Sequence, residues 1–260
     1  MDTKHIKVTP EWKKSKEQVW AERFAGLVDE APRLKLLHRR LWVRYAVAAV
    51  IAALIFLPTI AYLYTTEVVV ERGKQLAVAL PDGSLVNLNA DSRLTYRPLW
   101  WKVSREVTLN GEGFFRVMKG SRFTVNTVHG SVAVLGTSFN VFSRKERFDV
   151  TCLTGKVQVS SGEQSAVITP SKQARLVGRQ IQTSAVEHAK QAIGWTKGWF
   201  YFDHTPLHEV IDEVERQYNI HVTASGLPDV YYTGSFSRDK TPDVVLEIIG
   251  KPFGITLTAN

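Results

Sequence analysis

The residues that most resemble a chemical site are two histidines, His204 and His208, which stand four positions apart. On a helix this spacing places two imidazoles on one face, as in zinc proteases. The glutamate that follows the first histidine in those enzymes is absent here, and the sequence offers no evident third ligand. Asp203 or Thr205 as a helix cap, with His208 on the solvated face, explains the segment without a metal. We therefore expect no metal and no other cofactor.

The sequence also lacks the motifs that carry catalysis. It contains no G-x-S-x-G, no P-loop and no dinucleotide-binding fingerprint. Gly111, Glu112 and Gly113 fall between predicted strands, where a turn explains them. The single cysteine, Cys152, cannot form an internal disulfide, and its alternating surroundings predict a small buried side chain. The sequence does not indicate an enzyme.

Positive charge is concentrated at the beginning of the chain. The net charge is +8, and residues 1–44 contribute +5 of it from eleven basic and six acidic side chains. A basic excess can indicate nucleic-acid binding. Here it directly precedes an apolar segment, which favours an explanation by membrane topology. We expect an association with the membrane and no direct contact with nucleic acid.

The apolar segment, residues 45–64, carries no charged side chain. A helix of this length spans about 30 Å, the thickness of a bilayer core. Basic residues are denser before the segment than after it, so the positive-inside rule places the N-terminus in the cytoplasm. A cleaved signal peptide is not indicated, because the segment begins more than forty residues into the chain. We predict one transmembrane helix; the alternative is the core helix of a soluble domain.

The cytoplasmic arm, residues 1–44, is expected to form a helix from Thr9 and Pro10 onward. Such a helix has no domain of its own on which to bury large side chains, so it needs a partner. We favour docking into a groove of a cytoplasmic protein; the alternative is an amphipathic helix on the inner leaflet. At 100° per residue, five apolar side chains share an arc of about 140°: Trp12, Val19, Trp20, Phe24 and Leu27.

The remainder of the chain shows two sequence patterns, one in each of two segments. Residues 65–180 alternate apolar and polar positions, with turns such as Asp82-Gly83, and predict an antiparallel sandwich or rolled sheet. Residues 190–260 predict strand, helix, strand twice over, with helices opening at Thr205-Pro206 and Thr241-Pro242. The expected fold class is a mix: a helical arm over 1–44, one transmembrane helix over 45–64, a β domain over 65–180 and a small α+β domain over 190–260.

Both segments resemble domains of a known protein family. Between residues 73 and 159 the sequence contains LPDGSLVNLNADSRLTY, REVTLNGEGFFRV, FTVNT, VAVLGTSFNV and LTGKVQV, in the order found in the FecR domain of Gram-negative anti-sigma regulators. The tail from Trp195, with GWFYFDHTPLHEVIDEVERQYNI, is similar to the C-terminal domain of such regulators in Bacteroidetes. One departure is Gly113, where the family usually shows alanine.

The resemblance implies a transmembrane anti-sigma factor of the inner membrane. The arm would bind an extracytoplasmic-function (ECF) sigma factor, and the five apolar residues of the helical face are the expected contacts. The periplasmic part would read the signalling domain of a TonB-dependent outer-membrane transporter, and an intramembrane protease could release the signal near residues 45–64. The rival hypothesis is an anchored envelope protein that binds glycan or peptidoglycan, with Trp100 and Trp101 as exposed aromatic residues.

Overall fold

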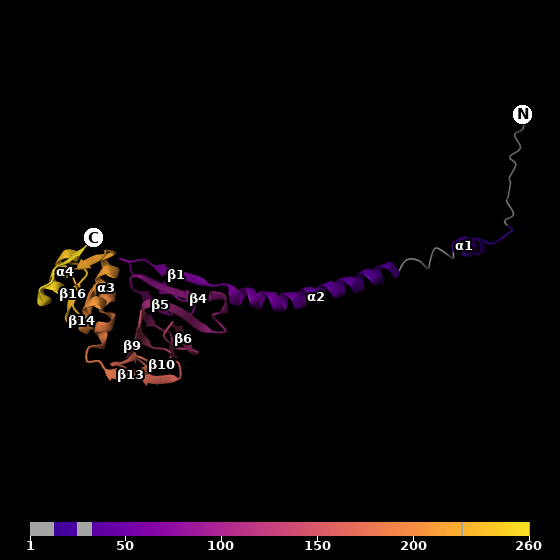
Figure 1. Cartoon of the computed structure of the whole chain (residues 1–260). Coiled ribbons are helices and arrows are strands. Elements are labelled where there is room, and N and C mark those ends of the chain that lie inside the picture. The colour runs from indigo at the N-terminus through magenta and orange to yellow at the C-terminus, as the bar shows by residue number, and fades with distance from the viewer. Residues whose placement is uncertain (1–12, 25–32, 225, 260) are drawn as a thin grey trace, which may run out of the picture. The chain divides into compact units, whose positions relative to one another are not determined.

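The structure, a computed structural model of the whole chain, describes residues 13–24, 33–224 and 226–259 (Figure 1). Contacts divide the chain into two compact units, residues 1–59 and 60–260.

Helix α1 (Lys16–Phe24) begins with a reciprocal cap. The backbone N–H of Gln18 donates to Ser15 Oγ at 3.3 Å, and the backbone N–H of Ser15 donates to Gln18 Oε1 at 3.1 Å. This capping box satisfies two N–H groups that the first turn cannot pair. The helix therefore starts later than the sequence predicted: Thr9 and Pro10 lie outside the described residues, but Lys13 and Lys14 are described and precede the helix.

Helix α2 (Arg33–Leu63) contains the apolar segment. Its part from Leu41 to Leu63 is long and apolar enough to cross a membrane, and it is the one such helix among the described residues. It corresponds to the predicted segment 45–64, with four more residues at the start. Pro58 lies inside the helix.

A rolled sheet of thirteen strands, which we call the β region, follows the helix. Buried and exposed positions alternate along several strands, as expected of a sheet with one face on a core. The predicted turn at Asp82-Gly83 joins β2 to β3, with Gly83 at φ 81°. The strands are β1 (Thr66–Val70), β2 (Leu76–Ala79), β3 (Leu85–Leu88), β4 (Ser92–Tyr96), β5 (Arg105–Arg116), β6 (Phe123–Asn126), β7 (Ser131–Val134), β8 (Ser138–Arg144), β9 (Arg147–Thr154), β10 (Val157–Ser161), β11 (Gln164–Ile168), β12 (Lys172–Val177) and β13 (Gln180–Ala185).

Strand β5 bends in its middle and so allows the sheet to roll. It pairs with β4 up to Asn110 and with β8 from Gly111 onward. Gly111 has φ +115°, and a Cβ there would lie 2.5 Å from Ser92 Oγ, so only glycine fits. The sequence placed this glycine in a turn between strands; that was wrong, because it lies inside one long strand.

The pairing of β5 with β6 is parallel, whereas the other strand pairs described are antiparallel. After the bend the chain returns beside the start of its own strand, with Phe123 opposite Arg105. Arg105 holds the return segment, since its guanidinium donates to Met118 O at 2.9 Å and to Ser121 O at 2.7 Å.

The C-terminal part, which we call the α+β region, repeats strand, helix, strand twice, as predicted. Two two-stranded sheets, β14 with β16 and β15 with β17, pack with the helices around a second core. The predicted apolar face of the first helix is buried at Val210, Ile211 and Val214. The predicted fold class is therefore confirmed. The elements are the 3-10 helix η3 (Ala189–Lys197), β14 (Trp199–Pro206), α3 (Leu207–Tyr218), β15 (Val222–Ala224), β16 (Tyr231–Ser237), α4 (Pro242–Gly250) and β17 (Leu257–Ala259).

Candidate functional sites

Helix α1 presents apolar side chains that no described residue covers. Trp20 is 62% exposed, Phe24 39% and Val19 37%, and none of the nine residues of the helix is buried. The rings of Trp20 and Phe24 lie 4.6 Å apart, as expected for positions i and i+4. The structure thus brings these two predicted contact residues together, with Val19 beside them. Trp12 and Leu27 lie outside the described residues.

Glu22 of α1 lies outside the arc of the apolar side chains, whereas Lys16 and Arg23 fall within that arc and interrupt the apolar stripe. Lys14 and Glu22 form an exposed ion pair with a nitrogen–oxygen distance of 2.7 Å. A pair of this kind contributes little to stability, and it leaves the aromatic pair unobstructed. An exposed Trp–Phe pair beside a valine is the type of surface that fills a hydrophobic groove on a partner.

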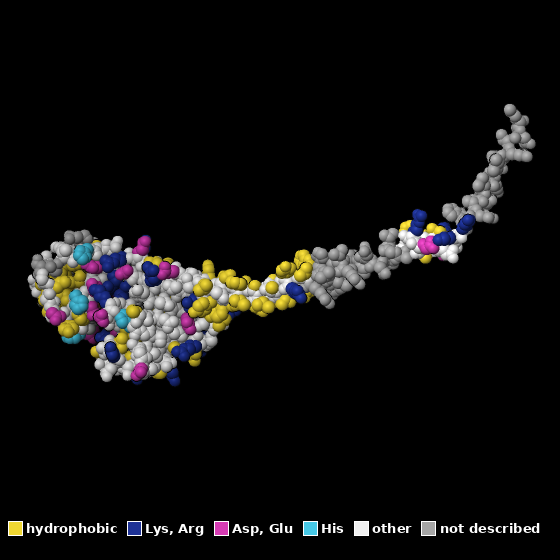
Figure 2. All heavy atoms as spheres, turned by 45° about the vertical axis from the view of Figure 1, so that its right-hand side comes forward, with side chains coloured by type: hydrophobic (Ala, Val, Ile, Leu, Met, Phe, Trp, Pro, Cys, Tyr) yellow, Lys and Arg dark blue, Asp and Glu magenta, His cyan; other side chains and the backbone are white. Residues whose placement is uncertain are grey.

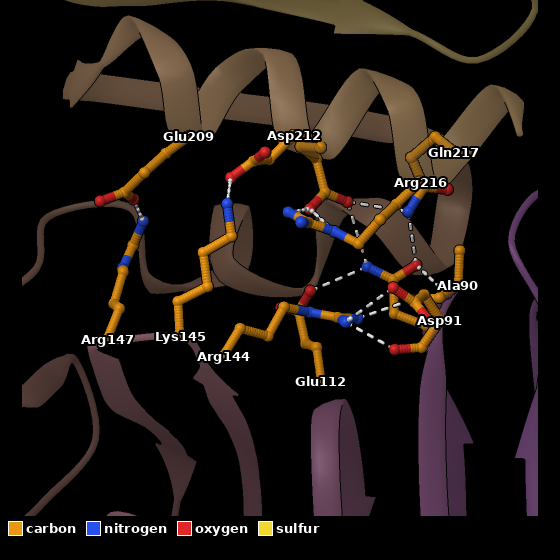
Figure 3. A network of polar contacts seen from close by, with 12 residues as sticks. Ala90, Asp91, Glu112, Arg144, Lys145, Arg147, Glu209, Asp212, Arg216 and Gln217 are labelled. Carbon is orange, nitrogen blue, oxygen red and sulfur yellow. Dashed lines mark hydrogen bonds and ion pairs between the residues drawn. The ribbon is translucent and has the colours of Figure 1, made fainter. Parts of the chain in front are cut away.

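The second candidate site is the junction between the β region and the α+β region (Figure 3). Three basic residues stand where β8 meets β9, and two of them, Lys145 and Arg147, point toward acidic residues of α3. Arg147 donates to Glu209 Oε2 at 2.7 Å, and Lys145 pairs with Asp212. The third, Arg144, instead donates to backbone oxygens of the β region, including Ala90 O at 2.6 Å.

Two buried carboxylates occupy the centre of this junction. Burial and the nearby Glu213 carboxylate raise the pKa of Glu112 to about 7, against hydrogen bonds from Asn140 and Asn89. Burial also opposes ionisation of Glu213, but the guanidinium groups of Arg216 and Arg144 outweigh it and hold the Glu213 pKa below its ordinary value. Glu213 is therefore the charged member of the pair, and Glu112 titrates near neutral pH.

Backbone contacts tie the junction to the segment that follows β1. The N–H of Gly73 donates to Arg216 O at 2.7 Å, and the Arg238 guanidinium donates to Gly73 O. Gln75 Nε2 donates to Trp195 O at 3.2 Å. The α+β region is thus attached to the connection between β1 and β2.

A groove of about 1100 Å³ runs along the junction. Its walls combine ion pairs with aromatic side chains of the α+β region, among them Trp199, Tyr201 and Tyr231. In the space-filling view the same face shows mixed basic, acidic and histidine side chains (Figure 2). Its charges are mostly paired with one another, so the groove is not a simple anion or cation site.

His204 and His208 do not share a helical face, although their spacing in the sequence would allow it. His204 is in β14, with φ 43°, and its ring stacks on Tyr231 at 4.2 Å. His208 is on the exposed face of α3, as expected. Trp100 and Trp101, the two aromatic residues of the rival hypothesis, are not both exposed. Trp101 is buried against Phe123, whereas Trp100 lies nearer the surface.

Sequence reasoning missed the junction entirely. Its signal was present in two short runs, RKER at residues 144–147 and EVIDEVER at residues 209–216, which carry complementary charges. The sequence prediction rested on the apolar face of the second run alone. The pairing itself joins residues 62 positions apart, as for Arg147 and Glu209.

Comparison with known proteins gives a consistent result for both regions. Residues 66–158 match the family described as FecR protein, and residues 199–258 match FecR, C-terminal. A crystal structure at 2.50 Å of a candidate anti-sigma factor from Parabacteroides distasonis ATCC 8503 is 31% identical over 76% of this chain and 100% of its own, with a TM-score of 0.69. A second of the same description, at 1.65 Å, is 32% identical over 75% of this chain and 99% of its own, also with a TM-score of 0.69. No curated protein matches the chain.

Proposed function

Because this chain belongs to the FecR family, we propose that it is an anti-sigma factor that sequesters an ECF sigma factor and responds to a TonB-dependent outer-membrane transporter. The observation that carries the proposal is the match of both regions to the family, together with an N-terminal helix whose aromatic pair has no partner among the described residues. On this account the protein acts by binding and not by catalysis.

The arm, residues 1–44, is the proposed sigma-binding segment. Trp20 and Phe24 would enter a groove of the sigma factor, with Val19 beside them. Trp12 and Leu27 extend the proposed face along the sequence. Large aromatic residues at the centre of an interface commonly carry most of its binding energy, so a short helix is sufficient for sequestration.

The remaining boundaries follow the predicted order. Residues 45–64 would cross the inner membrane once, with the arm in the cytoplasm, as the basic residues before the segment favour. Residues 65–180 and 190–260 would lie in the periplasm as a β domain and a signalling-type α+β domain. The two separate hydrophobic cores support this division.

In the periplasm the signalling domain of the transporter would contact this part of the chain. A partner can change the state of the arm only if it binds two states of the protein differently. The junction supplies an element that could exist in two states, closed by the Arg147–Glu209 pair or open. Regulated cleavage by an intramembrane protease near Pro58 would then free the arm and its sigma factor, because a proline weakens the helix locally.

Reconstituted transcription tests sequestration. Each ECF sigma factor of the source organism is combined with core RNA polymerase and its promoter, with and without the full-length chain in nanodiscs. We expect transcription by one sigma factor to fall when the full-length chain is added, and to remain unchanged when a variant that begins at residue 45 is added. If no sigma factor responds to the full-length chain, sequestration is wrong.

A further inference from the structure

The connection between β4 and β5, residues 97–104 with the sequence RPLWWKVS, places apolar side chains in solvent at one end of the β region. Leu99 is 61% exposed and Val103 is 70% exposed. Lys102 between them is also exposed. A rigid turn that exposes two large aliphatic residues beside a lysine calls for an explanation, because soluble surfaces rarely concentrate such residues in one loop.

The turn is well ordered by its own contacts. Trp101 packs in the core of the β region, with its ring 5.8 Å from Tyr96 and 6.0 Å from Phe123. The backbone N–H of Val103 donates to Trp100 O at 2.9 Å. Since Trp101 anchors the turn from inside, the exposed positions of its neighbours are fixed by the fold.

The pairing of β1 with β4 determines where this loop lies relative to the end of helix α2. Helix α2 ends at Leu63, and β1 begins at Thr66, which pairs with Tyr96 at the end of β4. Because β4 runs antiparallel to β1, residues that follow Tyr96 continue back toward the end of the helix. The loop must therefore lie level with the last helical turn.

Side-chain contacts agree with this register. The ring of Trp100 meets the ring of Tyr62 edge to face at 5.6 Å, and the Arg97 guanidinium carbon lies 4.5 Å above the same Tyr62 ring. Tyr62 is the last residue but one of the candidate span. In the space-filling view, hydrophobic side chains cover the end of the β region where the last turn of α2 enters it (Figure 2).

From this placement we propose that the RPLWWKVS loop inserts into the interfacial layer of the bilayer, with Leu99, Trp100 and Val103 against lipid. The inference rests on the proposed transmembrane span. That span, 23 residues long, measures about 35 Å as a helix, which exceeds the bilayer core of about 30 Å and places Tyr62 among the headgroups. Trp100 shares that depth, where tryptophan and lysine are favoured. The loop thus gives the β region a second attachment to the membrane and fixes its orientation on the surface.

The test uses the full-length chain in phospholipid vesicles, with one introduced cysteine labelled by an NBD fluorophore. The natural Cys152 is buried and takes no label. The test position is Val103→Cys. Its matched control is Val128→Cys, a valine that is 86% exposed beyond the far end of β6. It lies five residues past Phe123, roughly 16 Å of strand. Leu54→Cys, within the span, reports whether the helix crosses the bilayer.

We expect lipids with a nitroxide near the headgroup to quench the probe at residue 103 strongly. Aqueous iodide should quench this probe only weakly. The probe at residue 128 should show the opposite pattern, and the probe at residue 54 should be quenched by nitroxides deep in the bilayer. If residue 103 behaves like residue 128 while residue 54 is quenched from the lipid, the loop proposal is wrong and the span stands. If iodide reaches residue 54, the span itself is wrong, and the loop proposal falls with it.

Discussion

Glu112 of strand β5 and Glu213 of helix α3 share one amide donor across the junction. Asn89 Nδ2 lies 2.8 Å from Glu112 Oε2 and 3.5 Å from Glu213 Oε1. Two buried carboxylates this close do not both ionise readily. Arg216 and Arg144 stabilise the charge of Glu213, so Glu112 is the group whose proton responds to pH.

The first prediction concerns the pH dependence of stability. The pKa of Glu112 is raised from 4.5 to about 7 in the folded protein. Between these two values the folded state binds more protons than the unfolded state, so this group's contribution to stability is complete below pH 4.5 and is lost as pH rises through 7. We expect Glu112→Gln, which removes the charge, to stabilise the chain at pH 8 by at least about 1 kcal/mol. Thermal unfolding in detergent measures this.

The same variant provides its own control at low pH. Near pH 5 Glu112 is largely protonated, so the glutamine should change the melting temperature much less. The Asn140 amide can turn over to accept a hydrogen bond from the N–H₂ group of the introduced glutamine, because the Asn140 Oδ1 has no hydrogen-bond partner among the described residues. Equal melting-temperature shifts at pH 5 and pH 8 would contradict the assignment of the proton to Glu112.

A second prediction separates the two ion pairs at the rim of the junction. Arg147 is 32% exposed in its side chain and also contacts the buried Asp149 at 2.7 Å. We expect Arg147→Ala to lower the free energy of unfolding by about 1–3 kcal/mol, because buried polar partners lose a charged donor. Lys145→Ala, which removes an exposed lysine paired with Asp212, should lower it by less than about 1 kcal/mol. If denaturant unfolding gives equal losses for the two variants, the contacts of Arg147 contribute no more to stability than the exposed Lys145–Asp212 pair.

A third prediction compares two glycines of the same strand. Gly111→Ala would bring a Cβ to 2.5 Å from Ser92 Oγ and 2.8 Å from Ser92 Cα, at a φ of +115°. We expect a loss of more than about 2 kcal/mol, because the backbone bend cannot be kept. Gly113→Ala meets the Phe115 ring at 3.1 Å and Leu88 Cδ2 at 3.5 Å, both side-chain atoms, and the position has no positive φ. It should therefore change stability by about 1 kcal/mol or less.

Gly113 is also the position where the family usually shows alanine. A soluble, folded Gly113→Ala beside an unfolded or strongly destabilised Gly111→Ala is the expected outcome. Similar thermal stability of both variants would mean that the β5 bend does not depend on Gly111.

Local patterns in the sequence predicted most elements of the fold. The Asp82-Gly83 turn, the helix after Pro206 and the apolar segment in α2 are encoded by residues that are neighbours in the chain. Periodicity reports whether a segment is amphipathic, so these elements follow from it directly. The buried position of Cys152 was predicted for the same reason.

Contacts between distant residues were not predictable in this way. The bend of β5 depends on Ser92 lying against Gly111, and the junction depends on Arg147 reaching Glu209. Neither pair leaves a periodic signal in either segment. The start of α1 was missed for a different reason: Thr9-Pro10 and Ser15 both resemble caps, and Gln18 at the third helical position, which completes the capping box at Ser15, was not weighed.

The most direct test of the account is the affinity of the full-length chain, in nanodiscs, for the sigma factor that it inhibits in transcription. We predict that Trp20→Ala combined with Phe24→Ala weakens this affinity at least about 100-fold, since two central aromatic contacts are lost. Glu22→Ala, on another face of the same helix, removes only an exposed ion pair with Lys14 and should change affinity by less than about threefold. If all three proteins bind the sigma factor equally, the aromatic face of the arm is not the docking site.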